Sequence, residues 1–403
     1  MGYLRKMIKP AISNIFQQFF NSEKAGGLIL ICCTVLSITI ANSSVGLEFT
    51  HFWHLSVPLQ IGGISIPFNI EEWINDGLMS VFFLLVGLEI ERELYIGELS
   101  SFKNAILPVM AAVGGMMVPA LIHFLFNRGT PEQAGIGIPM ATDIAFSLGV
   151  LSLIGKRIPL SLKIFLTALA IIDDLGAVIV IAIFYTKGFS LFYLAAAMAL
   201  FLILIWVNRR RVFPLWLYLP IGILLWYFFY RSGIHPTLSG VVLAFAIPFR
   251  KNLERQPSSV LQHALHKPVN FIIVPLFALA NTAIHLPTGW KHEIFSSNSL
   301  GISLGLLLGK PVGIAAFTAL GISLGIAKLP QGVNMIKIIG MGLLAGIGFT
   351  MSIFISNLAF GSNDELIQTS KVAVLIASFL AALLGWIILK AGLGKSETKL
   401  TVP

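Results

Sequence analysis

The chain has 403 residues, of which 56% are apolar and only 11% are charged, and its mean hydropathy is +0.88. Soluble globular proteins carry about 25% charged residues, so this composition excludes that class and indicates an integral membrane protein. The net charge of +9 does not indicate a nucleic-acid partner, because the basic residues gather at the ends of apolar segments, where they set the orientation of a membrane protein.

The apolar runs predict an all-α polytopic membrane protein, a single membrane domain over residues 1–403, at about 20 residues per spanning helix. The twelve predicted spans are 26–42, 73–95, 104–126, 134–155, 159–184, 189–207, 213–230, 235–249, 269–286, 299–325, 335–359 and 367–390. Most basic residues fall in loops on the side of the N-terminus, which predicts that both termini are cytoplasmic. Residues 1–25 are predicted to be a cytoplasmic amphipathic N-terminus, and residues 391–403 a cytoplasmic tail.

The connection at residues 43–70 is polar and contains two alternating runs around Gly62-Gly63. This pattern predicts an extracytoplasmic β-hairpin loop. The hairpin could be an oligomer contact or a local lid.

Span 2 has an acidic residue near each end, Asp76 on the extracytoplasmic side and Glu89 on the cytoplasmic side. Glu91 and Glu93 follow Glu89 and complete an acidic mouth that could gather cations at a funnel entrance. Charged residues at helix ends are often only solvated, so Glu89, which lies deeper in the apolar run, is the stronger candidate.

Span 4 carries Gly135, Gly137 and Pro139 just before Thr142 and Asp143. Proline removes an intrahelical hydrogen bond, so we expect two half-helices joined by extended backbone near residues 140–142. Non-helical backbone at that depth is tolerated only inside protein or beside a watery cavity. A simple proline kink is the alternative.

Span 5 contains two adjacent acids, Asp173 and Asp174, in the middle of an apolar run. A charged carboxylate at the bilayer centre costs about 2.5–3.5 kcal/mol on insertion scales, so such residues indicate a functional site. Neighbouring helix positions differ by about 100° in azimuth. One carboxyl can therefore face an ion path while the other faces a neighbouring helix.

Three histidines could titrate near neutrality. His235 lies at the outer end of span 8, whereas His263 and His266 lie in the cytoplasmic loop before span 9, next to Gln262. Ordinary solvation or packing is the alternative for each of them.

Lys310 lies within span 10, just before Pro311, and is too central to reach water. We therefore expect a buried carboxylate partner, and we favour Asp173. In span 11, Gly346 and Gly348 have the same spacing as the glycines of span 4, which predicts a second interruption; a small-residue packing face is the alternative.

Spans 3–5 and 10–12 share one plan, a complete span, a discontinuous span and a complete span, and the two triplets start on opposite sides. They are therefore predicted to be inverted repeats, the pattern of secondary transporters whose binding site lies where discontinuous helices meet. At such a site Asp143 can offset the positive helix ends and Lys310 the negative ones.

Seven segments carry a family resemblance: FFLLVGLEIERE (82–93), ATDIAFSLGVLSLIGKRIP (141–159), FLTALAIIDDLGAVIVIAIFY (165–185), HPTLSGVVLAFAIP (235–248), VPLFALANTAI (274–284), LGKPVGI (308–314) and GIGFTMSIFI (346–355). Together they resemble the NhaA-type sodium/proton antiporter family, itself a known example of the inverted-repeat pattern, so the two inferences are not independent. The resemblance implies two interlocked inverted repeats, a homodimer, and exchange of Na+ or Li+ for H+.

The resemblance also implies roles for individual residues. Asp174 is the expected main ligand of the transported Na+, with Asp173 beside it and Thr142 supplying a further oxygen, while Asp143 and Lys310 face the crossed breaks. Glu89, Gln262, His263 and His266 are expected at the cytoplasmic rim, and Asp76 and His235 at the extracytoplasmic side. Gln262 stands where a glutamate of the family is expected, so we expect pH sensing at this rim to differ from that of the family.

These residues predict a mechanism in which Na+ and protons compete for Asp173 and Asp174, because two buried neighbouring carboxylates resist simultaneous ionisation. We expect an electrogenic, pH-regulated antiporter of the bacterial inner membrane that works by alternating access. Its partners would be Na+, H+, the lipid bilayer and a second copy of the chain, with no cofactor and no nucleic acid. The alternatives are an intramembrane aspartyl protease, in which two carboxyls face each other across a water, and a Na+-coupled organic solute symporter.

Overall fold

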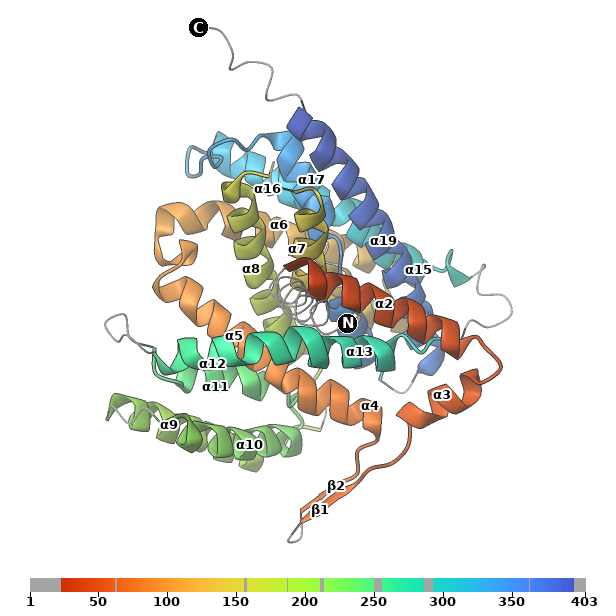
Figure 1. The fold of residues 1–403 in the computed structure, drawn as a ribbon, viewed down its shortest axis with the longest axis vertical. Coiled ribbons are helices and arrows are strands. Elements are labelled where there is room, and N and C mark those ends of the chain that lie inside the picture. The colour runs from red at the N-terminus through yellow and green to blue at the C-terminus, as the bar shows by residue number, and fades with distance from the viewer. Residues whose placement is uncertain are drawn as a thin grey trace, which may run out of the picture.

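The computed structural model describes residues 23–61, 64–155, 158–186, 188–210, 214–249, 256–285, 293–361 and 363–394. Most of the predicted amphipathic N-terminus and of the predicted tail lies outside these ranges. The described chain is a bundle of helices with one small hairpin at its edge (Figure 1). It is a multi-pass helical protein, as the composition predicted.

The chain reverses direction at Gly46, between the first two described helices. Helix α2 (Glu23–Ala41) and helix α3 (Gly46–Trp53) differ in direction by 119°. A side chain at Gly46 would collide with the carbonyl oxygen of Ala41, so only glycine allows this turn. Helix α3 lies in the connection at 43–70, where the sequence predicted only a hairpin.

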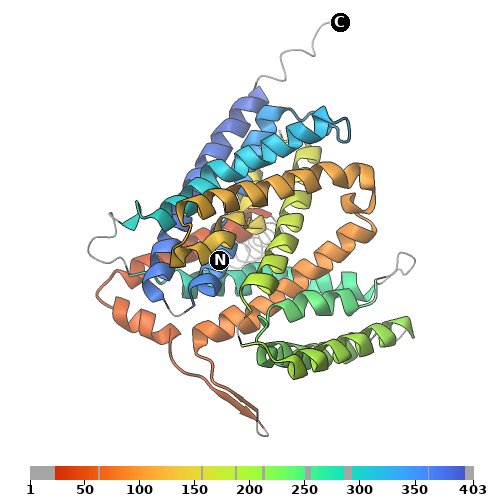
Figure 2. The same cartoon turned by 180° about the vertical axis from the view of Figure 1, so that it is seen from behind.

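The hairpin follows α3 and points away from the bundle (Figures 1 and 2). Strand β1 (Leu59–Ile61) pairs antiparallel with β2 (Ile64–Ile66), with Leu59 opposite Ile66. The strands flank the predicted turn, whose residues 62 and 63 lie outside the described ranges.

The remaining helices follow in chain order. They are α4 (Ile70–Glu72), η1 (Trp73–Leu78), α5 (Met79–Tyr95), η2 (Glu98–Ser100), α6 (Phe102–Phe126), η3 (Pro131–Met140), α7 (Ile144–Leu153), α8 (Leu160–Phe184), α9 (Leu191–Arg209), α10 (Leu215–Ser232), α11 (Leu238–Ala246), α12 (Pro257–Pro268), η4 (Val269–Ile273), α13 (Val274–Asn281), α15 (Ser297–Leu304), η5 (Gly305–Gly309), α16 (Lys310–Ser323), α17 (Met335–Ala345), α18 (Phe349–Phe360) and α19 (Asp364–Gly394).

Length and composition let seven of the described helices cross a membrane, or up to ten if each of three bent pairs counts as one span. Helix α11, in predicted span 8, has only nine residues, which is about 13.5 Å of helix at 1.5 Å per residue. The structure therefore supports a polytopic helical membrane protein without fixing the number of spans at twelve.

Helices α6 and α16 pack side by side, and Figure 2 shows them from behind. Gly114 of α6 and Gly313 of α16 face each other so closely that a side chain on either would strike the other's backbone. Small residues at such a contact let two helix backbones approach in a membrane. This contact fixes the position of Lys310, the first residue of α16.

Predicted span 9 starts earlier than expected. Helices α12 and α13, joined by the π-helix η4, run continuously from Pro257 to Asn281. His263 and His266 therefore lie on a helix, and their placement in a loop was wrong. Proline fits the first turn of a helix, and Pro257 occupies that position in α12.

Candidate functional site at the helix crossing

Two helices of the bundle are broken near their middles. Helices η3 and α7 meet at an angle of 44°, and α17 and α18 at 49°. Pro139 precedes the first break, and Gly346 and Gly348 form the second. A side chain at Gly346 would collide with the carbonyl oxygen of Leu306. The two predicted interruptions are thus present, although the first half of the earlier one is a 3-10 helix rather than an α-helix.

The two breaks lie against each other, and each donates hydrogen bonds to backbone carbonyl oxygens of the other. The amide of Asp143 donates to the carbonyl oxygen of Ile347 at 2.7 Å. The hydroxyl of Ser147 donates to Leu344 O, and that of Ser352 donates to Ile138 O, both at 2.7 Å. Buried carbonyl groups need such partners because no water replaces them in a membrane interior.

Asp143 joins the N-terminal ends of two helices. Its Oδ1 accepts from the amide of Phe146 at 2.9 Å, as the N-cap of α7. Its Oδ2 accepts from the amide and the hydroxyl of Thr350 in the first turn of α18, at 3.2 and 2.6 Å. A carboxylate is favourable there because helix N-termini carry a partial positive charge of about +0.5.

Lys310 lies at the opposite kind of helix end. Its side chain is fully buried, and its Nζ donates to the carbonyl oxygen of Met140, the last residue of η3. The same nitrogen lies 3.1 Å from Oδ2 of Asp173. The π-helix η5 ends just before Lys310. The residue after Lys310 is Pro311, which has no amide hydrogen and so cannot continue the regular hydrogen-bond ladder of an α-helix. The favoured pairing of Lys310 with Asp173 is the one found.

Thr142 connects Asp173 to the second broken helix. Its Oγ1 lies 2.7 Å from Oδ2 of Asp173 and 2.9 Å from the carbonyl oxygen of Ala345. A threonine hydroxyl has one proton to donate, so it donates to only one of these two acceptors at a time.

Asp173 and Asp174 both lie on α8, and each is only 1% exposed. Three of their four carboxyl oxygens, Asp173 Oδ1 and both oxygens of Asp174, have no hydrogen-bond partner among the described residues. An ionised carboxylate buried without partners costs several kcal/mol. Asp174 is therefore stable when it is protonated or when a cation lies beside it, whereas Asp173 already has Lys310 beside its Oδ2.

The charged side chains near Asp174 include Asp173, Asp143, Glu89 and Lys310. Three of the four are acidic, so a cation next to Asp174 would meet a mostly negative surrounding. Carboxylate and other oxygen atoms are the ligands that hard cations prefer. Among the described residues no three acidic, histidine or cysteine side chains lie close enough together to form a resident metal site, so what the crossing offers a cation is the unpartnered carboxyl oxygens of Asp173 and Asp174.

Glu89 is linked to Gln262, a residue that the sequence placed at the cytoplasmic rim. The side chain of Gln262 lies beside that of Glu89 where α12 packs on α5, and Gln262 is 7% exposed. His263 is exposed on the same helix, and its Nδ1 lies 2.8 Å from the carbonyl oxygen of Ser259. His266 is also exposed and lies beside Asn270. The structure thus brings Gln262 to Glu89 and places both histidines on the outer surface of α12.

Asp76 and His235 contact each other in the structure. The sequence placed both on the extracytoplasmic side but did not predict this pairing. Nε2 of His235 lies 3.2 Å from Oδ1 of Asp76, and Nδ1 of His235 lies 2.7 Å from Oγ1 of Thr237. Asp76 itself lies within the π-helix η1. Both ring nitrogens of this histidine are therefore engaged.

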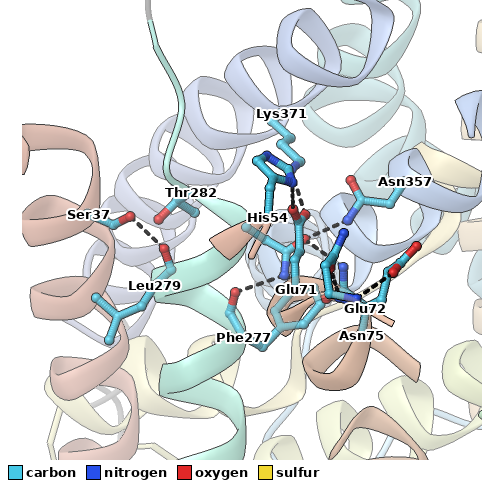
Figure 3. Close-up of polar contacts among 12 residues, drawn as sticks. Ser37, His54, Glu71, Glu72, Asn75, Phe277, Leu279, Thr282, Asn357 and Lys371 are labelled. Carbon is cyan, nitrogen blue, oxygen red and sulfur yellow. Dashed lines mark hydrogen bonds and ion pairs between the residues drawn. The ribbon is translucent and has the colours of Figure 1, made fainter. Parts of the chain in front are cut away.

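A second polar group lies near this pair, and Figure 3 shows several of its residues. We call it the Glu71 cluster; it consists of Glu71, Lys371, His54, Asn75, Asn281 and Asn357. Glu71 Oε1 lies 3.9 Å from Lys371 Nζ, and Glu71 Oε2 lies 3.5 Å from Nδ1 of His54.

The three asparagines of the Glu71 cluster tie three helices together. Asn357 Nδ2 donates to Asn281 Oδ1 at 2.6 Å, and Asn281 Nδ2 donates to Asn75 Oδ1 at 2.7 Å. Sequence reasoning missed this cluster. The signal was Lys371, a basic residue within the last apolar span, since a buried lysine requires a partner.

Comparison with known proteins gives a consistent result. A family model described as Na+/H+ antiporter 1 matches residues 17–389. The Na(+)/H(+) antiporter NhaA of Dechloromonas aromatica (strain RCB) is 56% identical over 379 residues, covering 93% of this chain and 95% of the relative. The proteins of that name in Cytophaga hutchinsonii and Flavobacterium psychrophilum are 53% and 52% identical, each covering 94% of this chain and 96% of the relative.

Proposed function

Since the chain belongs to the Na+/H+ antiporter 1 family, we propose that Asp173 and Asp174 are the carboxyls at which its transported ions compete. The protein is a multi-pass membrane transporter that exchanges Na+ for H+, and it is not an enzyme. Family membership thus favours antiport over the intramembrane aspartyl protease and the solute symporter that the residues alone left open.

The three partnerless oxygens of Asp173 and Asp174 carry this proposal. Buried carboxylates without partners need a proton or a cation. Na+ therefore enters as protons leave, and protonation releases Na+. Asp174 is the main ligand because both of its oxygens are free of hydrogen bonds within the described chain, whereas Asp173 already holds Lys310 and Thr142 through Oδ2. Li+, a smaller cation of the same charge, would bind the same oxygens.

Asp143 and Lys310 hold the crossing together in this proposal. Asp143 neutralises two helix N-termini, and Lys310 neutralises the C-terminal end of η3. The contacts between the two breaks support two discontinuous spans, 4 and 11, and we assign these to two inverted repeats, spans 3–5 and 10–12, within twelve spans.

The site would face each side of the membrane in turn. Glu89 and Gln262, with His263 and His266 nearby on α12, would form the cytoplasmic entrance and the pH-responsive rim. Asp76 and His235, with the Glu71 cluster, would close the extracytoplasmic side. If both aspartates release a proton for each Na+, the exchange is electrogenic.

The setting of the protein completes the proposal. We place it in the bacterial inner membrane as a homodimer. Both termini are cytoplasmic in this proposal, since loops rich in basic residues favour the cytoplasmic side. The chemistry needs only the transported ions and this chain's own carboxyls, with no cofactor.

The decisive test is Asp174→Asn. It keeps the shape of the side chain but removes the exchangeable proton and the charge, so Na+-dependent dequenching of a ΔpH dye in everted vesicles should be lost. Glu48→Gln, an acid on the exposed face of α3, is the matched control and should leave transport unchanged. Normal exchange by Asp174→Asn at equal expression would refute the assignment.

A further inference from the structure

A cavity of about 580 Å³ lies outside the carboxylate site. It forms where the first turns of α6 and α8 meet the connection between α16 and α17. Its floor is apolar, with Leu107, Phe165 and Ala168 buried at 4%, 3% and 2% exposure. The exchange of Na+ for H+ has no evident use for this space.

The rim of the cavity carries more positive than negative charge. Lys103 of α6 and Lys328 of the α16–α17 connection are both exposed at the rim, and Glu98 is the acidic residue among the lining side chains. Asn104 and Ser161 add polar groups. Helices α6 and α8 both begin here, so the positive ends of two helix dipoles add to the field of the lysines.

The cavity is continuous with apolar surface of the kind that contacts lipid. Ile164 and Ile326 line it and are themselves 36% and 51% exposed. Residues adjacent to the lining in sequence, Phe102, Leu160 and Leu324, are 80%, 71% and 62% exposed. In a membrane protein such surface faces acyl chains, so an occupant can combine an anionic group with hydrocarbon.

We propose that this cavity binds an anionic phospholipid, with its phosphate between Lys103 and Lys328 and its first acyl carbons against Leu107 and Phe165. The predicted orientation places these lysines on the cytoplasmic side, where anionic lipids attract basic residues. The phosphate group is shared by lipids and free phosphate, but only a lipid also fills the apolar floor.

A lipid at this position connects parts of the chain that carry the ion site. Helix α8 bears Asp173 and Asp174, and the α16–α17 connection follows the helix that starts at Lys310. Binding would therefore favour one relative position of these elements. Because a ligand stabilises the state that it binds, the midpoint of thermal unfolding should rise with lipid concentration.

The test uses the purified full-length protein, stripped of lipid in a neutral detergent. Phosphatidylglycerol, phosphatidylcholine and inorganic phosphate are added separately, and bound lipid is counted by native mass spectrometry alongside the thermal midpoint. Lys103→Gln and Lys328→Gln should each weaken phosphatidylglycerol binding about fivefold, since a basic group near a lipid surface contributes about 1 kcal/mol. Lys267→Gln, an exposed lysine on α12, is the matched control and should bind normally.

Ile164→Trp provides a second variant that keeps all charges and fills the mouth of the cavity. It should abolish phosphatidylglycerol binding even if the lysine variants are unstable. The proposal is overturned if Lys267→Gln loses as much affinity as the pocket variants, if phosphatidylcholine binds equally well, or if inorganic phosphate alone gives the same thermal shift. None of these readouts depends on transport, so they stand apart from the test of Asp174.

Discussion

The helix crossing and the Glu71 cluster are both rich in polar side chains, yet they differ in how those side chains are paired. At the crossing, Asp173 and Asp174 are 1% exposed and keep three oxygens without partners among the described residues. In the Glu71 cluster the carboxylate faces two basic groups, His54 and Lys371, and the side chain of Glu71 is 18% exposed. Asn357 Oδ1 in the Glu71 cluster also lacks a partner, but it belongs to a neutral amide, so buried carboxyl oxygens without partners are what distinguish the crossing from the Glu71 cluster.

The largest expected effect comes from removing the buried ion pair between Lys310 and Asp173 inside the crossing. Lys310→Ala leaves Asp173 and the carbonyl of Met140 without their cation. Removing one partner of a buried ion pair typically costs about 3–5 kcal/mol. We expect a lower midpoint of thermal unfolding in detergent and reduced transport, with an unchanged preference between Na+ and Li+.

A double variant sharpens this prediction. Lys310→Met with Asp173→Asn removes both charges, so most of the lost stability should return although transport should not. An unaltered thermal midpoint in Lys310→Ala would show that the pair contributes nothing to the crossing.

An intermediate effect is expected from Asn281→Ala in the Glu71 cluster. Asn281 is 1% exposed and accepts from Asn357 while it donates to Asn75. Leaving buried polar partners unsatisfied costs about 1–3 kcal/mol. The thermal midpoint should fall, and a cysteine introduced at Asn75 in this background should react faster with an impermeant thiol reagent from the extracytoplasmic side. Equal labelling rates with and without Asn281→Ala would contradict a closing role.

The smallest effect is expected from His54→Ala. The side chain of His54 is 62% exposed and lies 3.5 Å from Glu71. Exposed ion pairs contribute about 0–1 kcal/mol, so stability and transport should both remain within error of the unmodified protein. A large loss of transport at unchanged stability would mean that the His54–Glu71 contact, and not only the asparagines of the cluster, is needed to close the extracytoplasmic side.

The sequence was informative about the crossing because its residues violate strong rules. Asp173, Asp174 and Lys310 are charges in apolar runs, and Pro139 and Gly346 interrupt helices, so each stands out without a structure. A carboxylate partner for Lys310 also followed, since a buried charge needs an opposite one, and of the two aspartates left open the favoured Asp173 is the one it meets.

Other features had no such local signal. The asparagine contacts of the Glu71 cluster join residues separated by as many as 206 positions, and neutral amides are not costly enough to predict a partner. Helix α12 was not predicted because its polar residues are typical of a loop. The structure shows that one of them, Gln262, is buried against α5. The short α11 differs in the other direction: the apolar run at 235–249 is longer than its nine-residue helix, so the length of an apolar run overstates the length of the helix.

The hydroxyl of Thr142 lies between Asp173 on α8 and the carbonyl of Ala345 at the end of α17. An ionised Asp173 is the stronger acceptor, so the single proton of this hydroxyl then favours Asp173, 2.7 Å away, over the carbonyl of Ala345, 2.9 Å away. When Asp173 is protonated, Asp173 can donate to Thr142, whose own proton then turns to Ala345. If ions compete at these carboxyls as we propose, the protonation of Asp173 would decide whether the hydroxyl of Thr142 bonds to α8 or to the end of α17.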